Sequence, residues 1–536
     1  MKNKEKTMIR KTIIKENVYY DSVTLMLISS RVTGISGVQN AAVMMGTNQN
    51  KDLMLDSGLI TEEDAQRITP NHMVIGILAD NEHTIEEVLH GINDEMTKKN
   101  TSKSDGAKRV KTQEAAIKAQ PDSNFAIISI PGRFAKREVL KAIENNIHVL
   151  LFSDNVSIED EIELKEKALE KGLLMMGPDC GTAIINGVSL GFANVVSQGS
   201  IGIVAAAGTG LQEVSAIIDR KGEGISQAIG TGGRDIKEAV GGKMMLAGIE
   251  ALKEDSDTKV ILIVSKPASP GVTEKIYESL RGTTKPKVMC ILGGEAQQIK
   301  ANGFYFTETL EDAGTVAAEL VKGKEPTMTY FSETKEIISK HVHKEMAKLK
   351  PEQKYLRGLY GGGTLTYETL LIIRDILGDA YSNTPFKKEL LLPDVKESIG
   401  HTILDMGDDY FTNGRPHPMI DTRLRTERIK EEASKSETAV ILLDCVIGYG
   451  AHSDPAASLA KTINEVKETI LKDGRQIVFV ASICGTEKDP QVRSEQEKKL
   501  REAGVIVMKS NAQAARMAAI ITERGKSLDN LSWEVN

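Results

Sequence analysis

The sequence predicts an α/β protein of several domains built around parallel sheets. Short apolar runs alternate with charged stretches of helical periodicity over most of the 536 residues, and this alternation is typical of βα units. At roughly 150 residues per domain, the length predicts three or four domains. Hydrophobic residues make up 40% of the chain and charged residues 27%, which is the composition of a folded globular protein.

The first block, residues 1–100, is predicted to be a small α/β domain. Apolar runs that begin at Ser22 and His72 predict two strands, and helix-periodic patterns at residues 36–45 and 84–98 predict two helices. The pattern leaves open whether this domain binds a ligand or docks a partner.

A polar segment and a second set of βα units follow. Residues 97–124 are rich in Lys, Ser and Gln, which predicts a linker or mobile loop. Within the second block, residues 101–195, strands are predicted from Phe125 and from His148. A helix at residues 158–171 and the strand LLMMGPDCG come next.

Two further blocks repeat one local pattern. The third block, residues 196–330, opens with GSIGIVAAAGTGLQEV, and the fourth, residues 350–525, opens with RGLYGGGTLTYE. Each has a strand, then a glycine-rich turn, then a helix, and apolar strands such as KVILIVS and TAVILLDCV continue both blocks. The repetition predicts two related lobes, separated by a charged helical stretch near residues 335–350.

The composition excludes several classes of protein. Lys and Arg number 68 against 75 Asp and Glu, a net charge of −7, so no basic excess is present for a nucleic-acid partner. No window of about 18 uncharged apolar residues predicts a membrane span, and the first 20 residues carry charges throughout, unlike a signal peptide. The cysteines show no CxxC spacing, so neither a disulfide framework nor a zinc site is predicted and a reducing cytoplasm is expected. These cysteines are Cys180, Cys290, Cys445 and Cys484.

Three glycine-rich turns that follow apolar strands are candidate anion sites. They lie at residues 207–210, 361–364 and 448–450, each ahead of a helical pattern. Backbone amides at a helix N-terminus lack partners and lie at the positive end of the helix dipole, so they bind phosphate or carboxylate. A tight βα connection is the alternative for any one turn, whereas three turns in one chain favour anion binding. The candidate residues are Gly208, Thr209, Gly210, Gly362, Gly363, Thr364, Gly448 and Gly450.

The segment GTGGRD supplies a fourth candidate site. It contains Gly232, Gly233 and Arg234. A guanidinium at this position is suited to clamp a planar carboxylate or a phosphate through two hydrogen bonds. Alternatively, Arg234 and Asp235 pair with each other at a helix start.

A Pro-rich loop and one histidine complete the candidates. Residues 413–425, NGRPHPMIDTRLR, form either a substrate lid or a solvated loop, and they carry Arg415, His417, Arg423 and Arg425. His452 follows the third glycine turn, where it either donates to an oxyanion or is a capping or surface histidine. No HExxH motif, Ser-His-Asp order or GxxxxGK[ST] phosphate loop is present in the sequence.

These motifs together resemble a known family. The strand and helix order from Phe125 to Cys180, which ends in MMGPDC, is similar to the N-terminal domain of succinyl-CoA synthetase α-subunits. IGIVAAAGTGLQEV and GTGGRD resemble the second domain of that subunit, and YGGGTLTYE with AVILLDCVIGYGAHSD resembles the ligase domain of the β-subunit. A single chain that joins these pieces resembles the FdrA family. The resemblance implies a Rossmann-like domain followed by flavodoxin-like ligase domains of the succinyl-CoA synthetase type.

The chain departs from succinyl-CoA synthetases at three places. No stretch between the lobes is long enough for an ATP-grasp module, and Phe304 stands about where those enzymes carry their phosphorylated histidine. A lysine-rich segment replaces the strand and glycine-rich loop that begin their CoA-binding domain. Together, resemblance and departures imply a site without ATP, CoA, metal or other cofactor.

The FdrA resemblance implies a subunit of oxamate carbamoyltransferase, which converts oxalurate and phosphate into oxamate and carbamoyl phosphate in anaerobic allantoin breakdown. On this hypothesis the turns at 208–210 and 448–450 bind phosphate, Arg234 or the 415–425 loop holds the substrate carboxylate, and His452 or solvent protonates the leaving group. The expected partners are these small anions and other protein subunits. The alternatives are a component of an ADP-forming acyl-CoA synthetase and a catalytically silent binding protein on the same scaffold.

Overall fold

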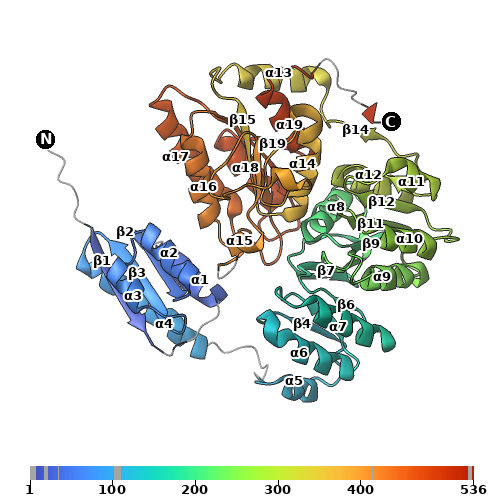
Figure 1. Ribbon diagram of the computed structural model, residues 1–536, viewed down its shortest axis with the longest axis horizontal. Coiled ribbons are helices and arrows are strands. Elements are labelled where there is room, and N and C mark those ends of the chain that lie inside the picture. The colour runs from blue at the N-terminus through green and yellow to red at the C-terminus, as the bar shows by residue number, and fades with distance from the viewer. Residues whose placement is uncertain are drawn as a thin grey trace. The chain divides into compact units, whose positions relative to one another are not determined.

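Two units of the chain are described separately (Figure 1). The first contains residues 1–110 with 409–421, and the second contains residues 111–408 with 422–536. Within these, the computed structural model describes residues 8–16, 18, 22–33, 35–101, 110–412, 415–528 and 534–535. In that part of the chain, every helix is too short or too polar to cross a bilayer.

The first unit is built on an antiparallel sheet with the strand order β1-β3-β2. The middle strand, β3, is antiparallel to both neighbours, so β1 and β2 run the same way and α1 connects them as a split βαβ unit. Its elements are β1 (Ile9–Lys15), α1 (Ser22–Thr33), β2 (Val38–Met45), α2 (Asn48–Asp56), α3 (Glu62–Arg67), β3 (Met73–Ala79) and α4 (Glu82–Thr101).

The strand predicted from Ser22 and the helix predicted at residues 36–45 are both wrong, because the structure places α1 and β2 there. In α1, Leu25, Ile28 and Val32 are buried at a spacing of three and four residues, which is one face of a helix. The apolar run therefore belongs to a helix that covers the sheet.

The sequence pattern of β2 did not predict a strand because both faces of its sheet are covered. Ala41 and Val43 belong to the core beneath α1 and α4, whereas Ala42 belongs to a second core that contains residues of α2 and the segment after it. A strand buried on both sides shows no polar alternation. The strand near His72 and the helix at 84–98 are confirmed as β3 and α4.

The linker predicted at residues 97–124 is wrong at both ends. The helix α4 continues to Thr101, and α5 (Gln113–Ala119) begins after Thr112, whose side chain accepts a hydrogen bond from the amide of Ala115. Residues 102–109 of the predicted linker lie outside the described part of the chain.

The second unit begins with a three-stranded parallel sheet, in the order β4-β5-β6, as predicted from Phe125 onwards. After β6 the chain enters a hairpin, β7 and β8, which joins the next sheet through β10 rather than this one. The elements are β4 (Phe125–Ile128), α6 (Gly132–Glu144), β5 (His148–Leu151), α7 (Ile158–Glu170), β6 (Met175–Met176), β7 (Thr182–Ile185) and β8 (Val188–Gly191).

Two lobes with the same topology follow, as the repeated sequence pattern predicts. Lobe 1 spans β9 to α12 and lobe 2 spans β15 to α19. Counted from the first strand of each lobe, both parallel sheets have the order 2-1-3-4-5, which is flavodoxin-like.

Lobe 1 contains β9 (Gln198–Ala205), α8 (Gly208–Arg220), β10 (Ile225–Gly230), α9 (Lys243–Glu254), β11 (Val260–Ser265), α10 (Pro270–Ser279), β12 (Lys287–Ile291), α11 (Ala296–Ala301), β13 (Tyr305–Phe306) and α12 (Leu310–Val321). Lobe 2 contains β15 (Tyr355–Tyr360), α14 (Gly363–Leu377), β16 (Thr402–Asp405), α16 (Arg423–Ser434), β17 (Thr438–Val446), α17 (Pro455–Leu471), β18 (Val478–Cys484), α18 (Arg493–Glu502), β19 (Ile506–Met508) and α19 (Asn511–Thr522). Between the lobes lie β14 (Met328–Thr329) and α13 (Lys335–Met346).

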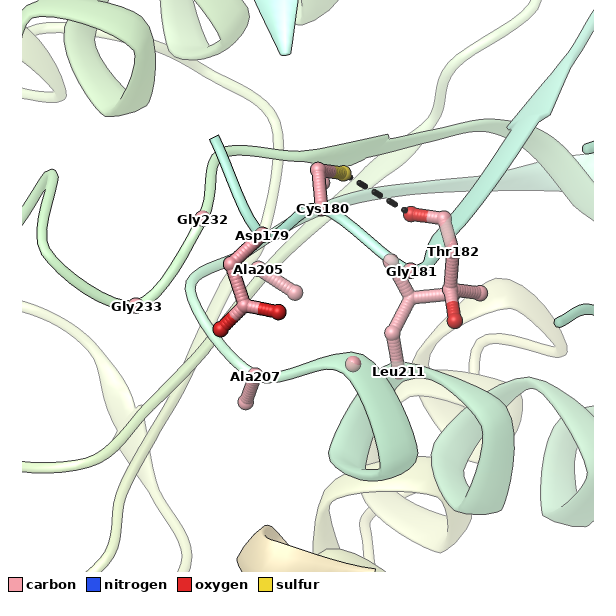
Figure 2. Close-up of a pocket in the computed structure, with 11 residues that line it drawn as sticks. Asp179, Cys180, Gly181, Thr182, Ala205, Ala207, Leu211, Gly232 and Gly233 are labelled. Carbon is pink, nitrogen blue, oxygen red and sulfur yellow. Dashed lines mark hydrogen bonds between the residues drawn. The ribbon is translucent and has the colours of Figure 1, made fainter. Parts of the chain in front are cut away.

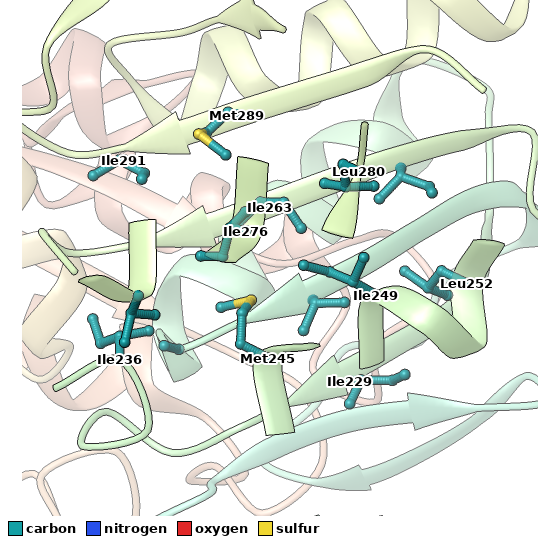
Figure 3. Close-up of a cluster of buried hydrophobic side chains, with 14 of the residues drawn as sticks. Ile229, Ile236, Met245, Ile249, Leu252, Ile263, Ile276, Leu280, Met289 and Ile291 are labelled. Atoms are coloured by element: carbon teal, nitrogen blue, oxygen red, sulfur yellow. The ribbon is translucent and has the colours of Figure 1, made fainter. Parts of the chain in front are cut away.

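A continuous apolar core packs one face of the lobe 1 sheet. Ile263 of β11 and Met289 of β12 belong to the same buried cluster as Met245 and Ile249 of α9 (Figure 3). The same cluster includes Leu150 of β5, so the small sheet and lobe 1 share a core. Burial of this kind fixes where the strands end, and ligands of such sheets bind beyond the carboxyl ends at the point where the strand order reverses.

Candidate functional site

The first helices of the two lobes, α8 and α14, meet end to end. The amide of Thr364 at the start of α14 donates to Oγ1 of Thr209 at the start of α8, 3.3 Å away. A Cβ atom on Gly210 would lie 2.9 Å from Cγ2 of Thr364, and one on Gly362 would lie 2.9 Å from Cγ2 of Thr209. Glycine is needed at both positions because the helix ends approach so closely. Two of the three predicted glycine turns are thereby brought together.

The start of α8 offers free backbone donors. The amides of Gly208, Thr209 and Gly210 have no hydrogen-bond acceptor among the described residues, and the N-cap residue Ala207 has no side chain able to supply one. Together with the positive end of the α8 dipole, these amides are suited to bind an anion.

A pocket lies beside these donors (Figure 2). It has an empty volume of about 220 Å³, including space open to solvent. Gly232 and Gly233 of the predicted GTGGRD site line it, together with Gly208. The full lining is Asp179, Cys180, Gly181, Thr182, Ala205, Ala207, Gly208, Leu211, Gly230, Gly232 and Gly233, which we call the Gly208 pocket.

One wall of the Gly208 pocket carries a carboxylate and a thiol. The side chain of Asp179 is directed toward Ala207 at the start of α8 (Figure 2). Burial raises the pKa of the Cys180 thiol to about 12, and its Sγ donates to the carbonyl of Thr182 at 3.6 Å. A thiol with this pKa is a poor nucleophile, so the pocket combines backbone donors with the carboxylate acceptor of Asp179.

The start of α14 is occupied by a carboxylate of the protein itself. The amides of Gly361 and Gly362 both donate to the side chain of Asp444, at 2.9 Å each for the shortest contacts. Asp444 is fully buried, and its Oδ1 lies 2.9 Å from Nη2 of Arg425. The predicted anion site at residues 361–364 is therefore filled at its first two amides, and the open helix start is that of α8.

The third glycine turn is also engaged by the protein. The amide of Gly448 donates to Oε1 of Gln491 at 3.0 Å, and the amide of Tyr449 donates to the carbonyl of Ala193 at 2.9 Å. A Cβ atom on Gly450 would lie 2.8 Å from the ring of Phe192. The segment that follows β8 thus covers this turn. The amides of Gly448 and Tyr449 are therefore not available to bind phosphate in the role predicted for the turn.

His452 lies in the loop that leads to α17. Its Nδ1 accepts a hydrogen bond from the amide of Asp454 at 3.0 Å, and its carbonyl accepts one from Nε2 of Gln491 at 3.1 Å. His452 thus lies just before the N-cap residue of α17, Asp454, whose side chain caps the helix by accepting from the amide of Ala457. Its proposed role as a proton donor stays a prediction.

Arg234 lies outside the lining of the Gly208 pocket and contacts the second block instead. Its Nε is 3.0 Å from Oε2 of Glu161 on α7, and its Nη2 donates to the carbonyl of Val156 at 2.8 Å. Asp235 accepts from the amides of Met244 and Met245 at the start of α9. The expected Arg234–Asp235 pair is therefore absent, and the guanidinium is engaged in joining α7 to lobe 1.

A fully buried lysine completes this network. Lys165 on α7 lies 2.8 Å from Oε1 of Glu161 and 2.8 Å from Oδ1 of Asp235, and all three side chains are inaccessible to solvent. Lys165→Met should lower the free energy of unfolding by about 3–5 kcal/mol, because it leaves two buried carboxylates without their shared cation. Urea unfolding measures the change. Lys167→Met, on the exposed side of α7, is the control, and equal effects of both variants would contradict the prediction.

The predicted lid loop is divided between the two units. Arg415 and His417 belong to residues 409–421, which group with the first unit, and Asn413 and Gly414 lie outside the described residues. Arg423 begins α16 in lobe 2. The two ends of the predicted loop thus belong to different units. The substrate-holding role of Arg415 and Arg423 stays a prediction.

Sequence reasoning missed two charged side chains at the carboxyl ends of the sheets. Lys266 directly follows β11, and Asp405 is the last residue of β16. The signal was present, because a charged residue that ends a fully apolar strand of a parallel sheet lies at the ligand-binding edge. Asp179 of the MMGPDC segment was missed as well; it lies in the loop after β6 and lines the Gly208 pocket.

A reciprocal pair of glutamates joins the lobes. Glu368 of α14 accepts from the amide of Leu310 at the start of α12, at 2.7 Å. Glu213 of α8 accepts from the amide of Asn511 at the start of α19, at 3.2 Å. Both glutamates are buried and occupy the sixth position of their helices, so each lobe caps the last helix of the other. This exchange holds the α8 and α14 starts against each other.

Glu368 predicts a pH dependence of stability. Burial raises its pKa to about 8, while hydrogen bonds from Asn511 and Leu310 act in the opposite direction. Because the pKa is raised in the folded state, the contribution of Glu368 is fully present below its ordinary pKa and is lost as the pH rises through about 8. Glu368→Gln should flatten the fall in the free energy of unfolding between pH 5 and pH 9, measured by urea titrations. The exposed Glu352→Gln should leave the slope unchanged, and a wild-type slope in Glu368→Gln would contradict the assignment.

Two regions of the chain match known families. Residues 359–521, which cover most of lobe 2, match the CoA-ligase family. Residues 8–113 match the family described as AllF, heavy metal-associated domain. The ligase domain expected from the resemblance is thereby found in lobe 2.

The residues of the first unit do not fit the heavy metal in that description. The sequence has no cysteine before Cys180, so the soft thiolate ligands of heavy-metal sites are missing from residues 8–113. Among the described residues, no group of three or more His, Cys, Asp or Glu side chains is arranged to hold a metal ion.

The chain is also similar to whole proteins. The uncharacterized protein YahF of Escherichia coli (strain K12) is 43% identical over 511 residues, which are 95% of this chain and 98% of that protein. The succinate–CoA ligase [ADP-forming] subunit alpha 1 of Archaeoglobus fulgidus is 26% identical over 213 residues, 39% of this chain and 71% of that subunit. The ATP citrate lyase of Methanothrix soehngenii is 13% identical, covering 78% of this chain and 85% of that one, with a TM-score of 0.35. The chain belongs to the family of the Escherichia coli protein YahF.

Proposed function

We propose that this protein is a subunit of a phosphate-dependent carbamoyltransferase, which converts oxalurate and phosphate into oxamate and carbamoyl phosphate. The observation that carries the proposal is the Gly208 pocket, where the free amides of α8 lie beside the Asp179 carboxylate. The proposal also rests on the resemblance of the chain to the FdrA family.

The chemistry of the pocket suits a ligand that combines an anionic group with a hydrogen-bond donor. Backbone amides at a helix start bind phosphate oxygens. The Asp179 carboxylate only accepts hydrogen bonds, so it favours an N–H or O–H group next to those oxygens. Hydrogen phosphate carries an O–H group of this kind, and carbamoyl phosphate carries the N–H groups of its amide.

A phosphohistidine route does not fit the residue at the expected position. Phe304 is 5% exposed and packs in the lobe 1 core, with its ring centroid 5.6 Å from that of Tyr277. Direct attack of bound phosphate on the substrate needs no such histidine. For this reaction, positioning and charge stabilisation are sufficient sources of rate enhancement.

The match of residues 8–113 to the AllF domain supports the proposal, because the carbamoyl-transfer hypothesis belongs to allantoin breakdown. The expected partners are other protein subunits. The first unit, which has no metal-binding cluster among its described residues, is then a docking domain for one of them.

A coupled assay tests the function. The full-length chain, purified with whatever copurifies from its host, is incubated with oxalurate, phosphate, carbamate kinase and ADP. ATP formation that requires both oxalurate and phosphate is the expected result. Its absence, with the partners present and added carbamoyl phosphate converted normally, would overturn the proposal.

A second candidate is a component of an ADP-forming acyl-CoA ligase. The CoA-ligase match of residues 359–521 and the succinate–CoA ligase relative favour it. In this case a partner supplies both the ATP-binding module and the histidine. Micromolar CoA binding in a calorimetric titration, together with no oxalurate phosphorolysis, is the result that would select it.

A further inference from the structure

Two charged side chains from different lobes lie beside α14 and have no hydrogen-bonded partner of opposite charge among the described residues. They are Asp405 of lobe 2 and Lys266 of lobe 1. Neither is used in the binding chemistry described above.

Asp405 presents one open carboxylate oxygen to the helix starts. The residue is 7% exposed, and its Oδ1 accepts a hydrogen bond from the amide of Gly407 at 3.0 Å. Its Oδ2 has no hydrogen-bond donor among the described residues and would lie 2.4 Å from a Cβ on Gly363. Because Gly363 has no side chain, the space in front of this oxygen stays open.

Lys266 is the cation that acts on this carboxylate. Its Nζ forms neither a hydrogen bond nor an ion pair with any described residue, and it lies 5.5 Å from the ring centroid of Tyr367 on α14. Burial lowers the pKa of Lys266, whereas the charges of Asp405 and Asp179 raise it. Lys266 therefore interacts electrostatically with the carboxylate of the Gly208 pocket and with that of lobe 2.

Burial shifts the pKa values of the two groups in opposite directions, upward for Asp405 and downward for Lys266. Burial raises the pKa of Asp405 to about 7, while the Lys266 charge lowers it. Asp408 of the following loop and Asp444 of β17 also act on Asp405 and raise its pKa. On Lys266, the further charges are those of Lys237, which lowers its pKa, and of Asp408, which raises it.

We propose that Asp405 and Lys266 carry the proton that the attacking phosphate loses to the nitrogen that leaves the carbamoyl carbon. This inference rests on the proposed function and assigns the acid–base groups of its site.

The proton balance of the reaction requires such a carrier. A phosphate oxygen forms a bond to the carbamoyl carbon while the bond from that carbon to the oxamate nitrogen breaks. Hydrogen phosphate loses one proton, the leaving nitrogen gains one, and the net charge is the same on both sides. Asp405 accepts the proton from phosphate, Lys266 donates one to the nitrogen, and transfer from Asp405 to Lys266 restores both groups. A group whose pKa lies near the working pH, as that of Asp405 does at about 7, is an efficient carrier of such a proton.

Kinetics of Asp405→Asn and Lys266→Met test the assignment. Each should lower kcat by about 10²–10⁴-fold, while the KM for phosphate changes little, and Asp405→Asn should also remove one limb of the pH profile. Asparagine keeps the acceptor for the Gly407 amide, so the variant preserves the fold. Lys300→Met, at an exposed lysine of lobe 1, is the control and should retain wild-type kcat. Unchanged kcat and pH profile in both site variants would overturn the inference.

Proton uptake on anion binding separates this inference from the proposed function. Sulfate carries no titrating proton near pH 7, and a bound anion raises the pKa of neighbouring groups. Calorimetric titration of the full-length chain with sulfate, in two buffers of different ionisation enthalpy, should show proton uptake by the wild type and its loss in Asp405→Asn. Equal uptake in the two proteins would overturn the carrier role. Uptake by a wild type that fails to phosphorolyse oxalurate would overturn the carbamoyl reaction but retain the titrating pair, and no sulfate binding would overturn both.

Discussion

Gly208→Asp should abolish phosphate binding without unfolding the protein. A Cβ on Gly208 meets only Oγ1 of Thr182, at 3.8 Å, so a side chain fits and enters the pocket. A new carboxylate about 4 Å from a bound anion costs about 4 kcal/mol at an effective dielectric constant near 20, which is a loss of affinity of more than about 100-fold. The same carboxylate interacts favourably with the α8 dipole, so stability should change by less than about 1 kcal/mol.

The variant reproduces in lobe 1 what Asp444 does in lobe 2, where a carboxylate of the chain occupies the helix start. Calorimetric phosphate titrations and thermal melts measure the two effects. Gly208→Asn is the matched control, because it has nearly the same size without the charge and should lose much less affinity. Equal phosphate affinity in Gly208→Asp and the wild type would remove the anion site from α8.

Asp444→Ala should be the most destabilising single substitution in lobe 2. It leaves the amides of Gly361 and Gly362 without acceptors and the 4% exposed Arg425 without its anion. Removing one partner of a buried ion pair costs about 3–5 kcal/mol. Hydrogen exchange of the β15 and β17 amides, with denaturant melts, measures the loss.

Two variants make this result specific. Asp473→Ala, at an exposed aspartate of lobe 2, should cost little, and Asp444→Asn with Arg425→Met should recover part of the loss because no unpaired charge remains. Added acetate should stabilise Asp444→Ala by rebinding at the vacated amides. A cost for Asp444→Ala no larger than that for Asp473→Ala would show that the pair is dispensable.

Most of the βα pattern of residues 125–522 could be predicted, because the parallel strands there are mainly short apolar runs that end at turn residues. The antiparallel hairpin of β7 and β8 was not predicted. The same rule failed between Ser22 and Met45, where a helix and a strand were exchanged. In that region both faces of a small sheet are covered, so β2 lacks polar alternation. The helix α1 is an apolar run, and its helical spacing shows in the buried Leu25, Ile28 and Val32. Local periodicity is informative only when one side of an element meets solvent.

The candidate site divides in the same way. The sequence by itself determined the strands, the glycine turns and the helices that follow them, because glycine and apolar spacing act within a few residues. The sequence could not show which of the three glycine turns keeps free amides for an anion. Only the tertiary structure decided that Asp444, 83 residues from Gly361, fills one turn, that Gln491 and Ala193 occupy another, and that the start of α8 keeps free donors beside Asp179. The physical reason is that an amide is satisfied by whichever acceptor the fold brings near it, and those acceptors lie far away in the sequence.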